Sequence, residues 1–194
     1  MAWGKAGSTT TTSSASSMDS GTMSASKFNQ ILCHVSGLSA STFCETLFNG
    51  STSGYDSRAK QNNGADFTRT SATDLNMFES YGNTTGAFLV SYFSNISGQE
   101  KLGVSSSVRE ANSAVSALPE FDEVGYLWNT TDQITSMSFT PQSGTVDTDS
   151  NLSILGSNIT TASAQDVTVT DGAIFYETDT NKEYILSNNT WTEL

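Results

Sequence analysis

Hydrophobic and polar residues alternate in short stretches along most of this chain, and a period of two is typical of β-strands. The clearest stretch is Lys27–Ser36 (KFNQILCHVS), which carries apolar side chains at both parities. Such a strand is expected to be covered on both faces or to lie in the centre of a sandwich. Stretches of the same kind are Thr42–Asn49, Tyr55–Lys60, Asp66–Ser71, Asp74–Ser80, Ala87–Ile96, Leu102–Arg109, Phe121–Trp128, Ile134–Thr140 and Asn151–Leu155.

Turn signals rich in Gly, Asn and Ser separate these stretches, and none of them has the period of an amphipathic helix. Many short strands joined by frequent turns are typical of antiparallel sandwiches. The sequence therefore predicts an all-β fold, an antiparallel β-sandwich of the jelly-roll kind, over residues 23–156.

The two ends of the chain have a different character. Residues 1–22 are rich in Ser and Thr and predict an extended N-terminal arm, either flexible or clamped as a strand onto a neighbour. Residues 157–194 predict a polar linker and a small C-terminal β-hairpin module with Trp191 beyond it. So short a module cannot form a stable core alone, so we expect it to dock on the main domain, on a second copy or on another protein.

Charge narrows the choice of partner. The 194 residues include 8 Lys and Arg against 20 Asp and Glu, which gives a formal net charge of −12. Nucleic acid and anionic membrane surfaces require clustered Lys and Arg, so neither partner is expected. No apolar stretch approaches the ~20 residues of a transmembrane helix, and the N-terminus lacks the apolar stretch of a secretory signal, so we expect no membrane insertion and no standard export.

The residue types that carry most enzyme chemistry are few and scattered. The chain has one His and two Cys. Glu120, Asp122 and Glu123 could in principle pair for glycoside cleavage, but as sequence neighbours beside a proline they predict a solvated loop. Residues 147–151 have the D-x-D-x-N spacing that opens a calcium loop but lack its Gly and Glu positions. We therefore expect no enzyme activity, no cofactor and no metal.

Cys33 and Cys44 flank a candidate hairpin loop over residues 36–41, which would place the two thiols directly opposite each other. Two outcomes are open, a cross-strand disulfide or a pair of buried free thiols. A metal site is not expected, because His34 is the only further ligand nearby and a fourth is missing.

Aromatic residues are the candidates for contacts with a partner. Aromatic side chains in a sandwich serve as core or interface anchors, or as platforms on which a sugar ring stacks. The five candidates for an interface or glycan contact are Trp3, Tyr55, Tyr81, Trp128 and Trp191.

Several short motifs resemble segments of tailed-phage virion proteins. They are residues 2–9 (AWGKAGST), 47–55 (LFNGSTSGY), 97–102 (SGQEKL), 134–137 (ITSM) and 149–156 (DSNLSILG). Residues 171–184 (DGAIFYETDTNKEY) are similar to a second phage-associated pattern. Gly50 and Ser51 stand where the family usually has an acidic residue, so a ligand held by that acid is not expected here.

This resemblance implies a jelly-roll virion structural protein of the capsid decoration, turret or fibre kind. Its expected partners are a major capsid protein or components of a fibre or tail, together with copies of itself in a homo-oligomer, with a trimer as the expected form. The expected location is the outer surface of the virion, after assembly in the host cytoplasm. The alternative is a carbohydrate-binding adhesin domain of a phage tail fibre, which would contact a host-surface glycan.

Overall fold

The computed structural model describes residues 3–11, 13–40, 42–62, 64–77, 86–110, 119–159, 172–177, 182–188 and 190–194. The chain forms two compact units, Met1–Thr160 and Thr161–Leu194. The described residues form strands, turns and loops, without a helix. The expectation of an all-β fold is confirmed.

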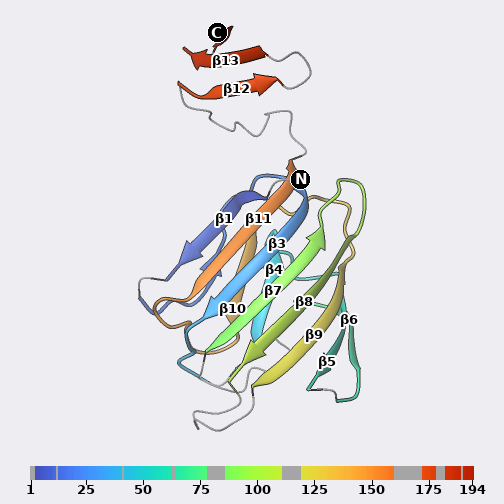
Figure 1. The fold of residues 1–194 in the computed structure, drawn as a ribbon. Helices are drawn as coiled ribbons and strands as arrows, with labels where there is room; N and C mark the ends of the chain where they lie inside the picture. Colours follow the sequence, from blue (N-terminus) through green and yellow to red (C-terminus); the bar gives the residue numbers. More distant parts are fainter. Residues whose placement is uncertain are drawn as a thin grey trace. The chain divides into compact units, whose positions relative to one another are not determined.

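The larger unit is an antiparallel sandwich of two unequal sheets (Figure 1). Its strands are β1 (Gly4–Thr10), β2 (Met18–Asp19), β3 (Ser26–Val35), β4 (Cys44–Phe48), β5 (Tyr55–Gln61), β6 (Phe67–Ala72), β7 (Ala87–Ser94), β8 (Lys101–Arg109), β9 (Glu120–Trp128), β10 (Met137–Pro141) and β11 (Asn151–Ile159). The large sheet has eight strands in the order β1-β11-β3-β7-β8-β9-β5-β6, and the small sheet has three in the order β2-β10-β4. The expectation of an antiparallel β-sandwich is confirmed.

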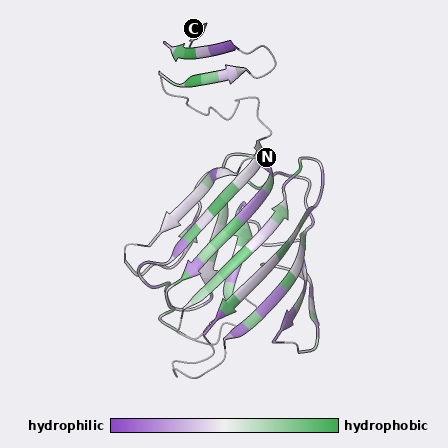
Figure 2. Cartoon of the chain, viewed as in Figure 1, coloured by the Kyte–Doolittle hydropathy of each residue, from purple (hydrophilic) through white to green (hydrophobic). Residues whose placement is uncertain are grey.

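The core lies between the two sheets. Ile31 and Ile154 of the large sheet and Phe139 of the small sheet are at most 1% exposed. The ring of Phe48 on β4 lies 5.5 Å from that of Phe93 on β7, so aromatic contacts join the two layers. Hydrophobic positions recur along β11, β3 and β7 (Figure 2).

The N-terminal segment is part of this sandwich. Of the two forms expected for residues 1–22, a flexible arm or a clamped strand, β1 and β2 form paired strands, and they pair within the larger unit itself. β1 pairs antiparallel with β11, and β2 pairs with β10. An edge strand leaves a row of unsatisfied backbone groups, and pairing with β1 satisfies those of β11. Gly7 permits close packing here, since a Cβ at that position would lie 3.0 Å from the carbonyl oxygen of Ser20.

The expected hairpin between Cys33 and Cys44 is wrong. β3 pairs with β7 and β11, whereas β4 pairs with β10 in the other sheet. Between the two cysteines the chain crosses from the large sheet to the small sheet. Leu38 lies in this crossing, is buried, and forms a bridge with Val146. The two cysteines are therefore free, buried thiols on opposite sheets.

The other strand expectations differ from the structure mainly at their ends. In place of the expected strand Asp74–Ser80, Leu75 forms an isolated bridge with Thr46, and residues 78–80 lie outside the described residues. The candidate Val167–Thr170 also lies outside them.

The smaller unit contains a three-stranded antiparallel sheet of β12 (Ile174–Glu177), β13 (Lys182–Ser187) and β14 (Thr190–Glu193). The expected hairpin corresponds to β12 and β13, and β14 adds a strand. The ring of Phe175 lies 6.2 Å from Tyr184 and 6.0 Å from Trp191. Leu186 lies opposite Trp191 in the sheet and is 6% exposed.

Candidate functional site

The face of the large sheet that points away from the small sheet carries exposed apolar side chains, and no described strand covers it. Alternate residues of the same strands point inward, as Leu89 and Phe93 of β7 do. We call the exposed group the outer apolar patch. Its members, each between 39% and 60% exposed, are Trp3, Phe88, Tyr92, Leu102, Val104, Val108 and Phe121.

In a sheet with one solvent-exposed face, apolar side chains usually point inward and polar ones outward. Strand β8 has the reverse orientation. Val104 is 58% exposed, whereas Ser105 and Ser107 are each 3% exposed. Lys101 and Arg109, at the two ends of the strand, share the inward parity of the serines, and both are buried. The partners of these two cations hold the strand in this orientation.

Lys101 is enclosed by backbone carbonyl groups. Its Nζ donates to the carbonyl oxygens of Ile96 at 2.8 Å, Thr131 at 3.4 Å and Gln99. Burial lowers the pKa of Lys101, and the nearby carboxylate of Asp132 opposes that shift. The ammonium group therefore joins the loop after β7 to the loop after β9.

Arg109 binds two of the carboxylates that the sequence singled out. Its Nη1 donates to Asp122 Oδ2 at 2.6 Å, and its Nε donates to Glu120 Oε2 at 2.6 Å. All three side chains lie on strands, so the expected solvated loop is wrong. Glu123 has the opposite parity and is exposed. The carboxylates of Glu120 and Asp122 thus share one guanidinium and do not flank an open substrate site.

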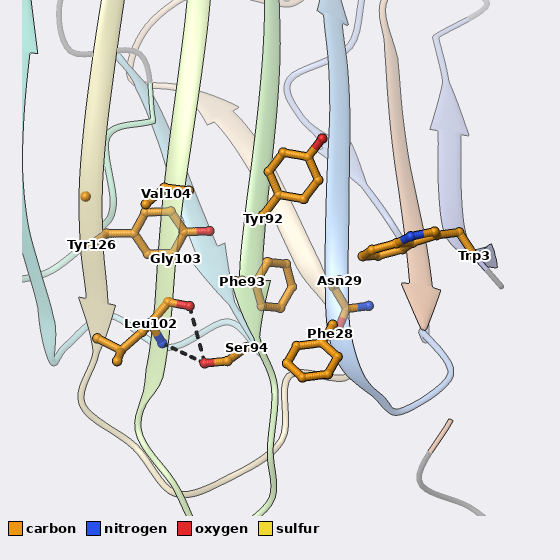
Figure 3. Close-up of a pocket in the computed structure, with 11 residues that line it drawn as sticks. Trp3, Phe28, Asn29, Tyr92, Phe93, Ser94, Leu102, Gly103, Val104 and Tyr126 are labelled. Carbon is orange, nitrogen blue, oxygen red and sulfur yellow. Dashed lines mark hydrogen bonds between the residues drawn. The ribbon is translucent and has the colours of Figure 1, made fainter. Parts of the chain in front are cut away.

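A shallow, open groove of about 640 Å³ crosses one end of the outer apolar patch (Figure 3). Trp3, Phe28, Tyr92 and Leu102 lie around it. Gly125 lies opposite Val104 on the neighbouring strand and adds no side chain there. The floor of the groove at Gly125 therefore lies below the side chains that project around it from the same face of the sheet.

The floor depends on a second glycine. A Cβ on Gly103 would lie 2.2 Å from Cζ of Tyr126, so the tyrosine ring occupies the space that a side chain would need. The Tyr126 hydroxyl and the Ser91 hydroxyl form a hydrogen bond of 2.8 Å. Burial raises the pKa of Tyr126.

Polar residues border the patch on both sides. On the β5 side, Arg58 and Lys60 lie with Asp66 and Glu123 around a second shallow depression. On the opposite side, β11 presents Ser153 next to Leu32 of β3. An apolar centre with a polar rim is the usual anatomy of a protein–protein interface.

The structure separates the five aromatic residues that the sequence singled out. Trp3 lies at the groove, and Trp191 lies on β14 of the smaller unit, each 43% exposed. Tyr55 and Trp128 are core residues, 1% and 4% exposed, with their rings stacked at 5.9 Å, so neither is a surface contact. Tyr81 lies outside the described residues.

The sequence reasoning missed the rest of the patch. The stretch Ala87–Ile96 (AFLVSYFSNI) is apolar at both parities, which was the available signal that one apolar row had no partner sheet. The sequence has no such signal for the orientation of the β8 side chains, since the valines of an alternating strand are expected to point inward.

Side chains that could bind a metal ion are dispersed in the described part of the chain. There, no three His, Cys, Asp or Glu side chains gather as a metal site would require. Within the same residues, no helix has the length and apolar character to cross a membrane.

Comparisons with protein-family models, curated proteins and solved structures found no match for this chain. Inference about its function therefore starts from the geometry described above and from the sequence motifs.

Proposed function

We propose that this protein is a non-enzymatic structural protein that acts by packing its surface against other protein subunits. The outer apolar patch is the observation that carries this proposal. Monomeric soluble proteins rarely expose apolar patches larger than a few hundred Å², and larger patches with polar rims mark interaction sites. Here the patch extends over β7, β8 and β9 and reaches Trp3 before β1.

The charged side chains support packing over catalysis. The buried Arg109 forms ion pairs with both Glu120 and Asp122, and Lys101 is enclosed by carbonyl oxygens. General acid–base chemistry needs groups that can exchange protons with a bound substrate. These groups are instead used to hold strands and loops together.

We further propose that the assembly is the virion of a tailed phage or a related virus, with the protein on its outer surface as a decoration, turret or fibre component. The motifs behind this resemblance have structural roles that suit a shared fold. Asn49 of the segment 47–55 accepts hydrogen bonds from the backbone N–H groups of Thr135 and Ser136, at 2.8 and 3.0 Å, in the segment 134–137. Lys101, of the segment 97–102, holds its loops as described.

A carbohydrate-binding adhesin is the second candidate. The observation in its favour is the groove, where Trp3 and Tyr92 are exposed and the Tyr92 hydroxyl accepts a hydrogen bond of 3.0 Å from Gln30 Nε2. Aromatic platforms suit sugar rings, but specific sugar binding also needs several polar groups around the ring. The groove is bordered mainly by apolar side chains, which favours a protein partner.

The test is the composition of purified particles. Particles from the cells that encode this chain are washed in high salt and quantified by mass spectrometry, with the major capsid protein as the internal standard. We expect the chain in a constant ratio to the capsid protein and accessible to antibody on intact particles. Loss of the chain on washing, or reproducible glycan binding by the free protein that is lost in Tyr92→Ala, would overturn the proposal.

A further inference from the structure

We infer that the outer apolar patch binds a second copy of this chain, so that two large sheets pack face to face in a homodimer. This inference deepens the proposed function, because it names the partner of the surface on which that proposal rests.

The area of the patch approaches what a stable dimer requires. Its seven side chains are 39–60% exposed. Since a large side chain has roughly 150–250 Å² of surface, the patch exposes on the order of 600 Å². A standard interface buries about 800 Å² on each partner. The half-buried Phe28, Leu32 and Val90 and the polar rim supply the difference.

The charge distribution permits contact between two copies at this face. A net charge of −12 on each chain opposes association in general. The seven members of the patch are uncharged. The exposed carboxylate of Glu123, on β9 between Phe121 and Gly125, lies opposite Lys60 of β5, and at the rim Arg58 lies 3.9 Å from Asp66. Two copies that meet at this face therefore bring together nearly neutral surfaces and keep most of their negative charge apart.

The shape of the face suits self-association about a twofold axis. An isologous interface requires one surface to hold both the projecting and the receiving features. Leu102 and Tyr92 project beside a groove that is low at Gly125. Twisted sheets pack face to face with their strands about 30° apart, and side chains of the two layers interdigitate. The groove of one copy can thus receive projecting side chains of the other.

The experiment measures the mass of the full chain by sedimentation velocity and by light scattering over a range of concentrations. The test variants are Val104→Lys and Phe121→Lys, one near each end of the patch. The matched control is Phe43→Lys, since Phe43 is 44% exposed against 45% for Phe121 and precedes β4 of the small sheet. Lysine lowers the net negative charge, so loss of association cannot result from added repulsion between acidic chains.

We expect the wild-type chain and Phe43→Lys to form dimers of twice the 20.6 kDa chain mass, more tightly in higher salt, which screens the repulsion. Val104→Lys and Phe121→Lys should dissociate at least about tenfold more readily while keeping the far-ultraviolet circular dichroism of the wild type. A wild-type chain that stays monomeric, or test variants that associate as tightly as the control, would overturn the inference.

The same variants separate this inference from the proposed function. A monomeric wild type whose Val104→Lys form is lost from particles would refute the homodimer and keep the structural role, with a different protein on the patch. A dimer that is absent from purified particles would keep the homodimer and refute the virion assignment. A larger assembly that the two test variants do not disrupt would place the contact between copies elsewhere and refute the inference.

Discussion

At the scale of single residues, Gly103 is required for packing and not for backbone conformation. Its strand φ is ordinary, but Tyr126 fills the space where a Cβ would lie, with Cζ 2.2 Å away. Gly125, on the neighbouring strand, points outward, and the nearest atom to its Cβ position is 3.9 Å away. The two glycines therefore form a natural pair for comparison.

We predict that Gly103→Ala lowers the free energy of unfolding by about 2–3 kcal/mol, because the buried tyrosine must move and its hydrogen bond to Ser91 is strained. Gly125→Ala should change it by less than about 0.5 kcal/mol, since the added methyl group makes only an ordinary contact, 3.9 Å from the carbonyl oxygen of Arg58. Urea denaturation of both variants measures the difference. Equal effects at the two positions would contradict the packing shown here.

Tyr55 gives a prediction for alkaline pH. Its hydroxyl accepts a hydrogen bond of 2.8 Å from the backbone N–H of Phe48, and burial raises its pKa from the ordinary 10.0 to about 12. The folded state holds the phenolic proton more tightly than the unfolded state, so this stabilising contribution is complete below pH 10 and is lost as the pH rises toward 12. The buried thiol of Cys44, with its pKa raised from 9.0 to about 12, acts in the same direction from a lower pH.

We therefore predict a free energy of unfolding that falls above pH 9 and falls more steeply above pH 10. In Tyr55→Phe the additional fall above pH 10 should be smaller, although the variant is less stable at every pH because the N–H of Phe48 loses its acceptor. Urea denaturation at a series of pH values, with tyrosinate absorbance followed in parallel, tests this. An unchanged pH dependence in Tyr55→Phe would be the contrary result.

At the scale of the elements, the ion pairs of Arg109 connect β8 to β9. Arg109 and Asp122 are 3% and 1% exposed, and their charged atoms lie 2.6 Å apart. Removal of one partner from a buried pair leaves an uncompensated charge in the protein interior. By contrast, Arg58 and Asp66 are 3.9 Å apart, and both are largely exposed.

We predict that Arg109→Met costs about 3–5 kcal/mol of stability, whereas Arg58→Met costs less than about 1 kcal/mol. Addition of Asp122→Leu to Arg109→Met should recover part of the loss, because the stranded carboxylate is removed. Thermal unfolding of the three variants gives the comparison. If the double variant were less stable than Arg109→Met alone, the ion pair would not be the origin of the cost.

At the scale of the whole molecule, the two ends of the chain differ in what they contribute. β1 pairs with β11 over residues Gly4 to Thr10, within the larger unit. Residues Thr161–Leu194 form a unit of their own. From the sequence, neither end of the chain is expected to form a stable core of its own. The pairing of β1 with β11 makes the N-terminal end part of the larger unit.

We predict that deletion of residues 1–10 lowers the stability of the sandwich by about 2–4 kcal/mol, because several backbone hydrogen bonds are lost and the edge of β11 is exposed. Deletion of residues 161–194 should leave its unfolding midpoint unchanged, and those residues alone should be unfolded, since so short a sheet cannot support itself. Circular dichroism during thermal unfolding tests all three. An equal loss of stability for the two deletions would contradict the division into units.

Strands β3 and β8 show which features of the fold can be predicted from the sequence and which cannot. For β3, buried residues such as Ile31 alternate with half-buried or exposed ones, and the strand lies within the large sheet between β11 and β7. The expected cover on both faces is found on the inner face only, since no described strand lies over the outer one. For β8, alternation correctly predicts a strand but not its orientation. Arg109 turns inward because Glu120 and Asp122 on β9 bind its guanidinium group. Lys101 turns inward because carbonyl groups in the loops after β7 and β9 accept its hydrogen bonds.

Local sequence selects the segments that become strands, since alternation and turn residues act over a few neighbours. The acidic charge and the scarcity of residues suited to catalysis can also be read directly from the residues. Long-range contacts set which strands pair, place Cys33 and Cys44 on opposite sheets, and bury Tyr55 and Trp128 while Tyr92 and Val104 stay exposed. Pairing and burial depend on contacts between residues far apart in the chain, and a small sheet of three strands covers only one face of a sheet of eight.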